Sequence, residues 1–127
     1  MLDSSAMVAI LLKEPGCEDL LEKVGRAPGV AAATPTLVET GLVLMAKTGK
    51  GSRSLLSLFV SEAGLALVPF GEAHWRAAAD AFWRYGKGRH RAALNFGDCM
   101  AYATAKLARE PLLCVGTNFV RTDLELA

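Results

Sequence analysis

Short apolar runs alternate along this chain with longer stretches in which apolar residues recur at helical spacing. This alternation is typical of an α/β domain with a mainly parallel sheet, because a helix must return the chain before the next parallel strand begins. The short runs predict strands at residues 1–3, 30–33, 65–69 and 112–115, with a last short strand near Leu124. The periodic stretches predict helices at residues 4–13, 15–26, 35–47, 53–63, 72–85 and 97–109.

Start signals support two of these helices. The Ser4 and Ser5 pair can cap the first one. Thr34 followed by Pro35 gives an N-cap and then a proline in the first turn of the third helix.

Length and composition limit the possible classes of fold and function. A chain of 127 residues with 52% hydrophobic content fits one globular domain with a core of its own. The formal net charge of +1 excludes a broadly basic nucleic-acid coat, so any contact with nucleic acid must come from a local patch.

The cysteines number three, Cys17, Cys99 and Cys114, and lack a C-x-x-C pair, which favours reduced thiols over a disulfide or zinc framework. The apolar run 6–12 is too short to cross a membrane, and Asp3 stands where a signal peptide would carry positive charge, so we expect a cytoplasmic protein.

Three acidic residues follow the predicted junctions of strands and helices. Asp3 ends the first strand, Glu39 lies about one turn into the third helix, and Asp98 opens the last helix. In a parallel α/β sheet the helix N-termini gather at the carboxyl edge, where ligands usually bind. We therefore expect the three carboxylates to converge there.

The surroundings of Glu39 indicate what such a cluster would hold. Its helix is apolar nearly all round, which predicts a buried helix, and no basic residue precedes Lys47 on it. A buried carboxylate is costly unless it is paired or binds a metal. Two carboxylates about 4 Å apart repel by roughly 4 kcal/mol at an effective dielectric of about 20, so three together need a cation or raised pKa values. Oxygen ligands suit magnesium or manganese, which also take phosphate oxygens, so phosphodiester chemistry follows.

Each acid also has a structural explanation when it is taken alone. Asp3 and Asp98 could simply be helix N-caps, and Glu39 could pair with a remote arginine. The expected convergence of all three on one edge is what favours a site.

Four segments together resemble PIN-domain toxins of the VapC type: DSSA at 3–6, TLVETG at 36–41, YGKGRH at 85–90 and LNFGDCMAYA at 94–103. The match runs nearly end to end, and its specific part is 85–103. The resemblance implies a single PIN domain over residues 1–127 with a three-layer α/β/α fold and a mainly parallel central sheet. It also implies a Mg²⁺- or Mn²⁺-dependent endoribonuclease acting on single-stranded RNA, a VapB-type antitoxin partner and a homodimer within a type II toxin–antitoxin complex.

The same resemblance implies roles for individual residues. Asp3, Glu39 and Asp98 match the catalytic metal ligands of the family, and Ser5 and Thr36 would support them. The bound cation is expected to activate a water and to leave a 5′-phosphate and a 3′-hydroxyl, without a covalent intermediate.

One part of the family pattern is missing. The family usually has a further acidic residue after the last core strand, and residues 116–119 read GTNF here. Asn118 could offer a carbonyl oxygen or hold a water, and Asp123 could substitute, although a structural turn residue explains Asp123 equally well. One firmly held metal is therefore expected rather than two.

The basic run Lys87, Arg89, His90 and Arg91 is the predicted RNA contact, because cations bind phosphates and the neighbouring Trp83 and Tyr85 offer stacking faces. A solvated, glycine-flanked loop is the alternative. Trp83 and Trp75 fall near one face of their helix and are expected in the core. The apolar stripe at 55–59 is either core or a groove for an antitoxin helix.

Two other functions compete. A phospho-accepting receiver domain has a similar sheet and an acidic magnesium site, but it needs an Asp after the third strand and a Lys after the fifth. Here residues 70–72 read FGE and no Lys follows 112–115, which argues against it. A catalytically inactive PIN-like binding module stays open because of Thr117 and Asn118.

Overall fold

The computed structural model describes residues 1–49 and 51–127. Within them the chain forms α1 (Ser4–Leu11), α2 (Cys17–Arg26), β1 (Ala31–Ala33), α3 (Thr34–Thr48), α4 (Ser52–Glu62), β2 (Ala66–Val68), α5 (Glu72–Tyr85), α6 (Phe96–Ala108) and the 3₁₀ turn η1 (Phe119–Arg121). Each predicted helix is confirmed, with ends that differ by two residues or fewer. α5 has the bounds that its periodicity predicts.

The sheet is parallel, as predicted, but its strands are very short. β1 pairs with β2, with Ala31 opposite Ala66. The other predicted strands contribute single parallel bridges, Leu2 to Leu113 and Leu112 to Leu126. The Leu2 amide also donates to the Ala31 carbonyl at 2.8 Å, which joins the first segment to β1. The order across the molecule is therefore β2, β1, the N-terminal segment, the segment around Leu113, and the segment around Leu126. The last of these segments lies close to Leu124, where a short strand was expected.

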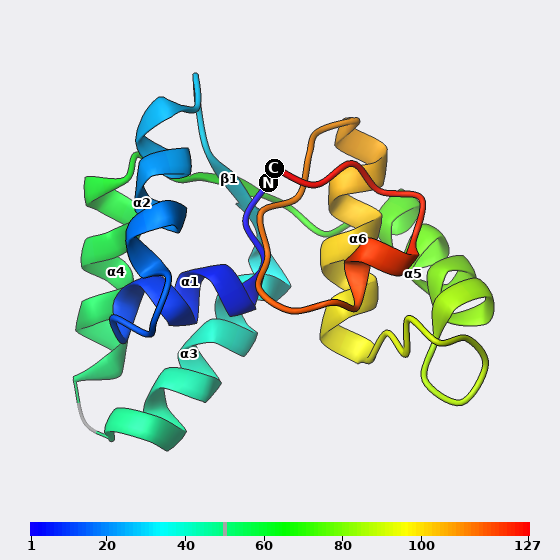
Figure 1. Ribbon diagram of the computed structural model, residues 1–127, viewed down its shortest axis with the longest axis horizontal. Coiled ribbons are helices and arrows are strands. Elements are labelled where there is room, and N and C mark those ends of the chain that lie inside the picture. The colour runs from blue at the N-terminus through cyan, green and yellow to red at the C-terminus, as the bar shows by residue number, and fades with distance from the viewer. Residues whose placement is uncertain (50) are drawn as a thin grey trace.

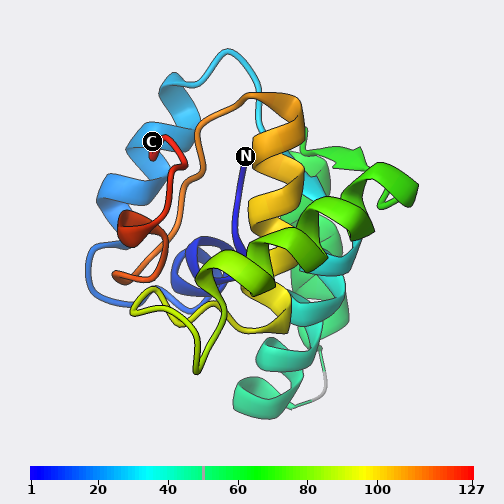
Figure 2. The same cartoon turned by 90° about the vertical axis from the view of Figure 1, so that its right-hand side faces the viewer.

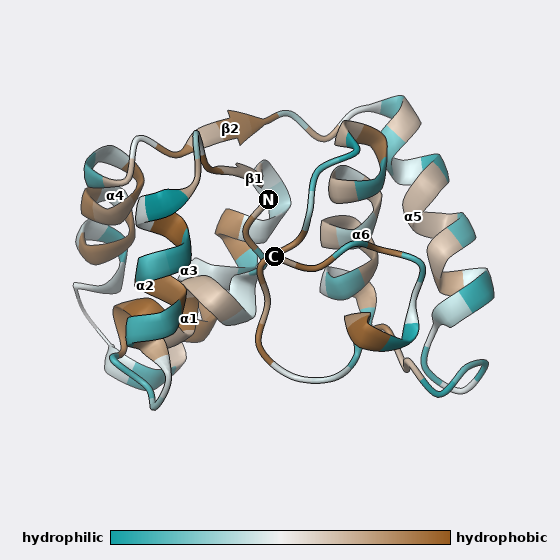
Figure 3. Cartoon of the chain, turned by 45° about the horizontal axis from the view of Figure 1, so that its top comes forward, coloured by the Kyte–Doolittle hydropathy of each residue, from teal (hydrophilic) through white to brown (hydrophobic). Residues whose placement is uncertain are grey.

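Helices cover both sides of these central segments. α1, α2 and α4 lie on one side, and α5 and α6 pack against each other on the other (Figures 1 and 2). The three-layer α/β/α arrangement is thereby confirmed. α1 is hydrophobic along its length (Figure 3), and its central residues, Met7 among them, are buried beneath the neighbouring helices.

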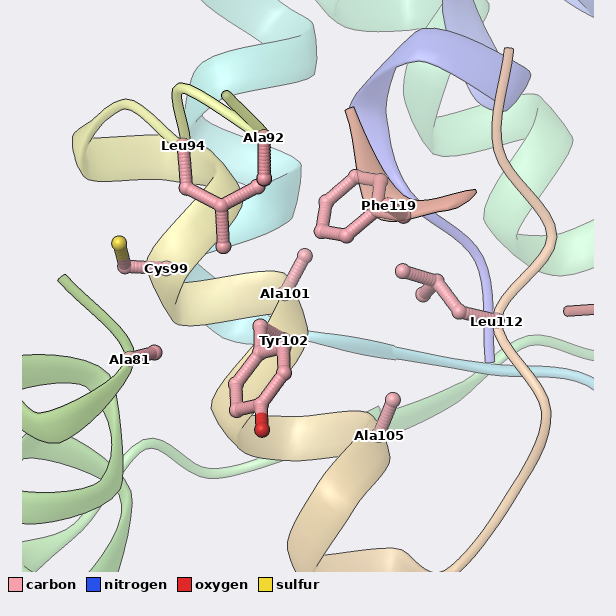
Figure 4. Close-up of a cluster of buried hydrophobic side chains, with 9 residues drawn as sticks. All are labelled: Ala81, Ala92, Leu94, Cys99, Ala101, Tyr102, Ala105, Leu112 and Phe119. Carbon is pink, nitrogen blue, oxygen red and sulfur yellow. The ribbon is translucent and has the colours of Figure 1, made fainter. Parts of the chain in front are cut away.

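A second buried cluster joins α5 and α6 to the C-terminal segments. Ala81 of α5 and Tyr102 of α6 lie in it with Leu112 and Phe119 (Figure 4). This cluster sets the position of α6, whose first turn carries Asp98.

Both predicted caps are wrong. Asp3 caps α1, because its carboxylate accepts the Ser5 amide at 3.0 Å, and Ser4 and Ser5 are already helical. Ala33 is the N-cap of α3 and has extended backbone angles, so the helix begins at Thr34 itself and no side chain caps it. A carboxylate is a stronger acceptor for helix N–H groups than a hydroxyl, which explains the first difference.

The expectation of a helix buried all round is wrong for α3. Thr36, Thr40 and Leu44 form its buried face, which packs toward α1, α4 and α6. Val38 and Leu42 on other faces are 63% and 57% exposed. Apolar content alone cannot tell which face of a helix its neighbours cover.

The tryptophans also differ from expectation. Trp75 and Trp83 are 52% and 69% exposed, so the prediction that they lie in the core is wrong. Ala78, Ala81 and Tyr85 make the contact of α5 with the core cluster instead. In the stripe on α4, Phe59 packs against the core around α1, whereas Leu58 is exposed. No helix in the described ranges is long and apolar enough to cross a membrane.

Candidate active site

Asp3, Glu39 and Asp98 line one open pocket of about 340 Å³. They come from the start of α1, the second turn of α3 and the first turn of α6, which are distant in sequence. The expected convergence of these three acids is found. What holds each carboxylate there differs from residue to residue.

Asp3 is fixed by Ser5. The Ser5 amide and hydroxyl both donate to Asp3 Oδ2, at 3.0 and 2.5 Å, and the Ser5 hydroxyl accepts the Val115 amide at 2.9 Å. Asp3 is only 2% exposed, and its other oxygen, Oδ1, is buried without a hydrogen-bond partner. Burial raises the pKa of Asp3 above its ordinary value, the bonds from Ser5 oppose that rise, and the charge of Asp98 adds to it.

Glu39 lies close against α6. A Cβ atom at Gly97 would overlap both carboxylate oxygens of Glu39, so a larger residue at this position would push that carboxylate from its place. Burial raises the pKa of Glu39, the hydroxyl of Ser4 opposes this through a hydrogen bond, and the charges of Asp3 and Asp98 raise it further. Glu39 is therefore under electrostatic strain that a cation would relieve.

Asp98 is held by a capping box at the start of α6. The Asn95 amide donates to Asp98 Oδ2 and the Asp98 amide donates to Asn95 Oδ1, both at 2.9 Å. The Asn118 side-chain amide also donates to Asp98 Oδ2, at 3.4 Å. One oxygen of this carboxylate is thus occupied by the protein, which fixes the orientation of the other.

Of the two residues expected to support the ligands, only Ser5 lines the pocket. Ser5 lies at the pocket and positions Asp3. Thr36 does not line the pocket; it is buried in α3, where its carbonyl accepts the Thr40 hydroxyl at 2.8 Å. Thr36 therefore belongs to the packing of α3 rather than to the lining of the site.

Of the two residues considered as replacements for the missing acid, only one lies at the pocket. Asn118 lines the pocket. Asp123 does not; its carboxylate accepts the Tyr102 hydroxyl at 2.5 Å and the Lys106 ammonium at 2.8 Å. The Lys106 and Tyr102 bonds lower the pKa of Asp123 to about 2. The structural explanation of Asp123 fits these contacts, and they give no support to its role as a ligand.

The basic run lies in the loop between α5 and α6, and none of its four residues lines the acidic pocket. The Arg89 guanidinium lies over the Trp83 ring, 4.1 Å from its centre. The His90 ring accepts the Ala92 amide at 3.1 Å and packs edge-on against Tyr85, which gives that histidine a local structural role. Lys87 and Arg91 are exposed.

The carboxylate oxygens of Asp3, Glu39 and Asp98 are suitable ligands for a hard cation such as Mg²⁺, but they are not yet arranged around a common point. In residues 1–49 and 51–127 no three His, Cys, Asp or Glu side chains are gathered as a ready metal site. Like charges keep carboxylates apart when nothing neutralises them. The buried, unpartnered Oδ1 of Asp3 is the specific observation that fits a metal, because such an atom is costly to leave unsatisfied.

Four further residues at the site escaped the sequence reasoning. Asn95, Glu14 and Lys47 line the pocket, and Gly97 lies against Glu39. The N-x-x-D spacing of Asn95 and Asp98 is a capping-box pattern and was a usable signal. Glu14 and Lys47 gave none, because only the packing of α1 beside α3 brings them to the pocket.

Comparisons with known proteins agree on one family. The model described as PIN domain matches residues 1–125. The chain is similar to ribonuclease VapC36 of Mycobacterium tuberculosis, with 45% identity over 126 residues that cover 98% of this chain and 91% of that protein.

Two solved structures show the same fold. VapC20 of Mycobacterium tuberculosis, a toxin that cleaves the sarcin-ricin loop, superposes with a TM-score of 0.80 at 12% identity and covers 99% of this chain and 96% of its own. VapBC2 of Rickettsia felis, bound to a DNA fragment from its promoter, gives 0.78 at 18% identity and covers 100% and 96%.

Proposed function

The chain belongs to the VapC ribonucleases of the PIN domain family, and we propose that it is a metal-dependent endoribonuclease that cleaves single-stranded RNA as the toxin of a type II toxin–antitoxin system. The observation that carries the proposal furthest is the meeting of three carboxylates from three helices in one pocket, one of them with a buried oxygen that lacks a partner. The closeness to named ribonucleases supports the same conclusion.

The proposal gives each residue of the pocket a separate role. Asp3, Glu39 and Asp98 would hold one Mg²⁺ or Mn²⁺, which supplies water activation at neutral pH and charge neutralisation on the phosphate. Ser5 holds Oδ2 of Asp3, which leaves Oδ1 available, and Asn118 restrains Asp98. Asn118 is uncharged, so the pocket offers fewer ligand charges than the family pattern, and one metal is proposed rather than two.

RNA contact is proposed for the loop between α5 and α6. Lys87, Arg89 and Arg91 provide exposed positive charge next to the exposed ring of Trp83. Cations beside an aromatic face suit the phosphates and unpaired bases of a single strand. His90 contributes to the shape of the loop through its bond from Ala92.

The partner is proposed from a structural neighbour. The matched Rickettsia felis structure is a VapBC assembly, which supports a VapB-type antitoxin as the partner of this chain. We further infer a homodimer within that complex. The exposed apolar residues Val38, Leu42 and Met45 of α3 give it a surface to bury. The cytoplasm, where such an RNA substrate is found, is the proposed location.

The proposed activity is tested by incubating purified protein with labelled single-stranded RNA and Mg²⁺ or Mn²⁺. We expect cleavage that leaves 5′-phosphate ends, is abolished by EDTA, and is lost in Asp98→Asn while thermal unfolding stays cooperative. Calorimetric titration with Mn²⁺ should give one binding event in the wild type and much weaker binding in the variant.

The same experiment addresses the alternative of an inactive binding module. Absence of cleavage under all metal conditions, with RNA binding unchanged in Asp98→Asn, would favour that module. Asp80→Asn is a suitable control, because Asp80 lies on α5 and does not line the acidic pocket.

A further inference from the structure

The acidic pocket continues along α1 and α3, away from the three carboxylates. On α3, Glu39, Val43 and Lys47 follow each other at four-residue spacing and all line it. On the other side, Asp3 at the start of α1, Val8 within it and Glu14 just beyond its end also line the pocket. Residues four apart share one helix face, so the α3 residues form one wall of a groove. The residues at the start, middle and end of the α1 segment form the other wall, and the groove runs from the carboxylates to Glu14 and Lys47.

Glu14 and Lys47 meet at that far end. The Lys47 ammonium lies 2.8 Å from Glu14 Oε1, and their side chains are 51% and 39% exposed, respectively. The Glu14 amide donates to the Ala9 carbonyl at 2.9 Å, which fixes the residue just beyond α1. An ion pair this exposed contributes about 0–1 kcal/mol, so a competing anion can separate it at little cost.

The charges of the groove are uneven. Of the described residues that line it, four are acidic, and Lys47 is the only basic one. A nucleic-acid strand entering this groove therefore has one cationic side chain among these residues to bind its phosphates, apart from any metal at the carboxylates. Lys47 lies eight residues beyond Glu39, about 12 Å along the helix axis, so it is too far to hold the phosphate that the carboxylates address.

We propose that Lys47 binds a phosphate flanking the scissile one, and that Glu14 holds Lys47 in place and is displaced when RNA enters. This inference rests on the proposed function for the identity of the strand. It assigns to α3 a second role, in which one helix face carries both a carboxylate of the centre and the cation that aligns the substrate.

The test is the binding of fluorescein-labelled single-stranded RNA of mixed sequence, measured by anisotropy in EDTA, where no cleavage occurs. Lys47→Gln should weaken binding roughly three- to tenfold, equally for all sequences, and should reduce the slope of log K against log salt by about 0.7, the value for one phosphate contact on a single strand. Glu14→Gln should tighten binding, because it frees Lys47 and removes a charge that repels phosphate.

The opposite signs separate this proposal from a stabilising ion pair. A purely structural pair would give both variants the same small loss of stability and no change in RNA binding. Lys106→Gln is the matched control, since Lys106 forms an equally short and exposed pair with Asp123 outside the groove. Equal binding by Lys47→Gln and Lys106→Gln would overturn the proposal.

The result does not depend on catalysis. If the protein binds RNA with these signs but never cleaves it, the proposed activity fails and the groove assignment stands. If it cleaves RNA and Lys47→Gln changes neither the affinity nor its salt dependence, the activity stands and the groove assignment fails.

Discussion

The backbone of Gly97 in α6 lies directly against the carboxylate of Glu39 in α3. This contact brings two helices together at the acidic pocket, and a side chain at position 97 would displace the carboxylate. It makes the position of Glu39 depend on a residue that has no functional group of its own.

Gly97→Ala should displace Glu39 and reduce cleavage by about a hundredfold, because small misplacements of catalytic groups have effects of that size. Because the added Cβ meets only the end of a flexible side chain, the free energy of unfolding should change by less than about 1 kcal/mol. Gly41→Ala is the control, since a Cβ there meets only Leu56 at an ordinary 3.6 Å. Its stability should rise by up to about 1 kcal/mol, from helix propensity. Equal activity of the two variants would contradict the importance of the contact.

Asp3→Asn should stabilise the protein in EDTA while abolishing activity. Burial raises the pKa of Asp3, so the folded state disfavours its ionised form and loses stability as the pH rises above the ordinary value of 3.8. A neutral amide removes this cost, and we expect a gain of about 1 kcal/mol at pH 7. Urea unfolding from pH 4 to 7 measures it. A variant less stable than wild type throughout this range would show that the carboxylate serves folding more than function.

Mn²⁺ should stabilise the wild type by up to about 2.7 kcal/mol at a hundredfold excess over its dissociation constant. Asn118→Asp adds a carboxylate next to Asp98 and replaces a hydrogen bond with repulsion. We expect this variant to be less stable than wild type in EDTA and to gain more from Mn²⁺. Thermal unfolding with and without the metal measures both effects, and Asn95→Ser, which keeps a capping side chain, is the control. An unchanged response to Mn²⁺ would place Asn118 outside the metal environment.

Tyr102→Phe should weaken the C-terminal segment at neutral pH. The Tyr102 hydroxyl donates to Asp123, and with Lys106 it lowers the pKa of that carboxyl to about 2. A lowered acidic pKa stabilises the fold above the ordinary value of 3.8, and that stability is lost as the pH falls toward 2.

The variant should lose about 1 kcal/mol at pH 7 and show a smaller further loss between pH 4 and 2 than the wild type. Urea unfolding of both proteins at several pH values measures these differences in the free energy of unfolding. Parallel stability curves for the two proteins would mean that the hydrogen bond to Asp123 has no energetic weight. RNA cleavage at pH 7 should be unchanged, because neither residue lines the acidic pocket.

The helices could be predicted because their signals are local. The periodicity of residues 72–85 marks α5 without reference to the rest of the chain. The three acids could be placed together because parallel topology gathers helix N-termini at one edge. The exposed face of α3 could not be predicted, since it depends on which neighbours cover the helix. Lys47 was noted only as the first basic residue after Glu39, and its place at the pocket follows from the packing of α1 beside α3.

Asp3 and Asp98 are at once members of the acidic pocket and acceptors for backbone N–H groups at helix starts: Asp3 is the N-cap of α1, and Asp98 completes the capping box of α6. Substitutions that remove their side chains altogether therefore leave the Ser5 and Asn95 amides without these partners, at about 1 kcal/mol each. In a population of cells that survive expression of this gene, escape mutations at these two codons should yield poorly accumulating proteins rather than inert, well-folded ones. Asparagine at either codon should be the exception, because it keeps the cap and removes the charge.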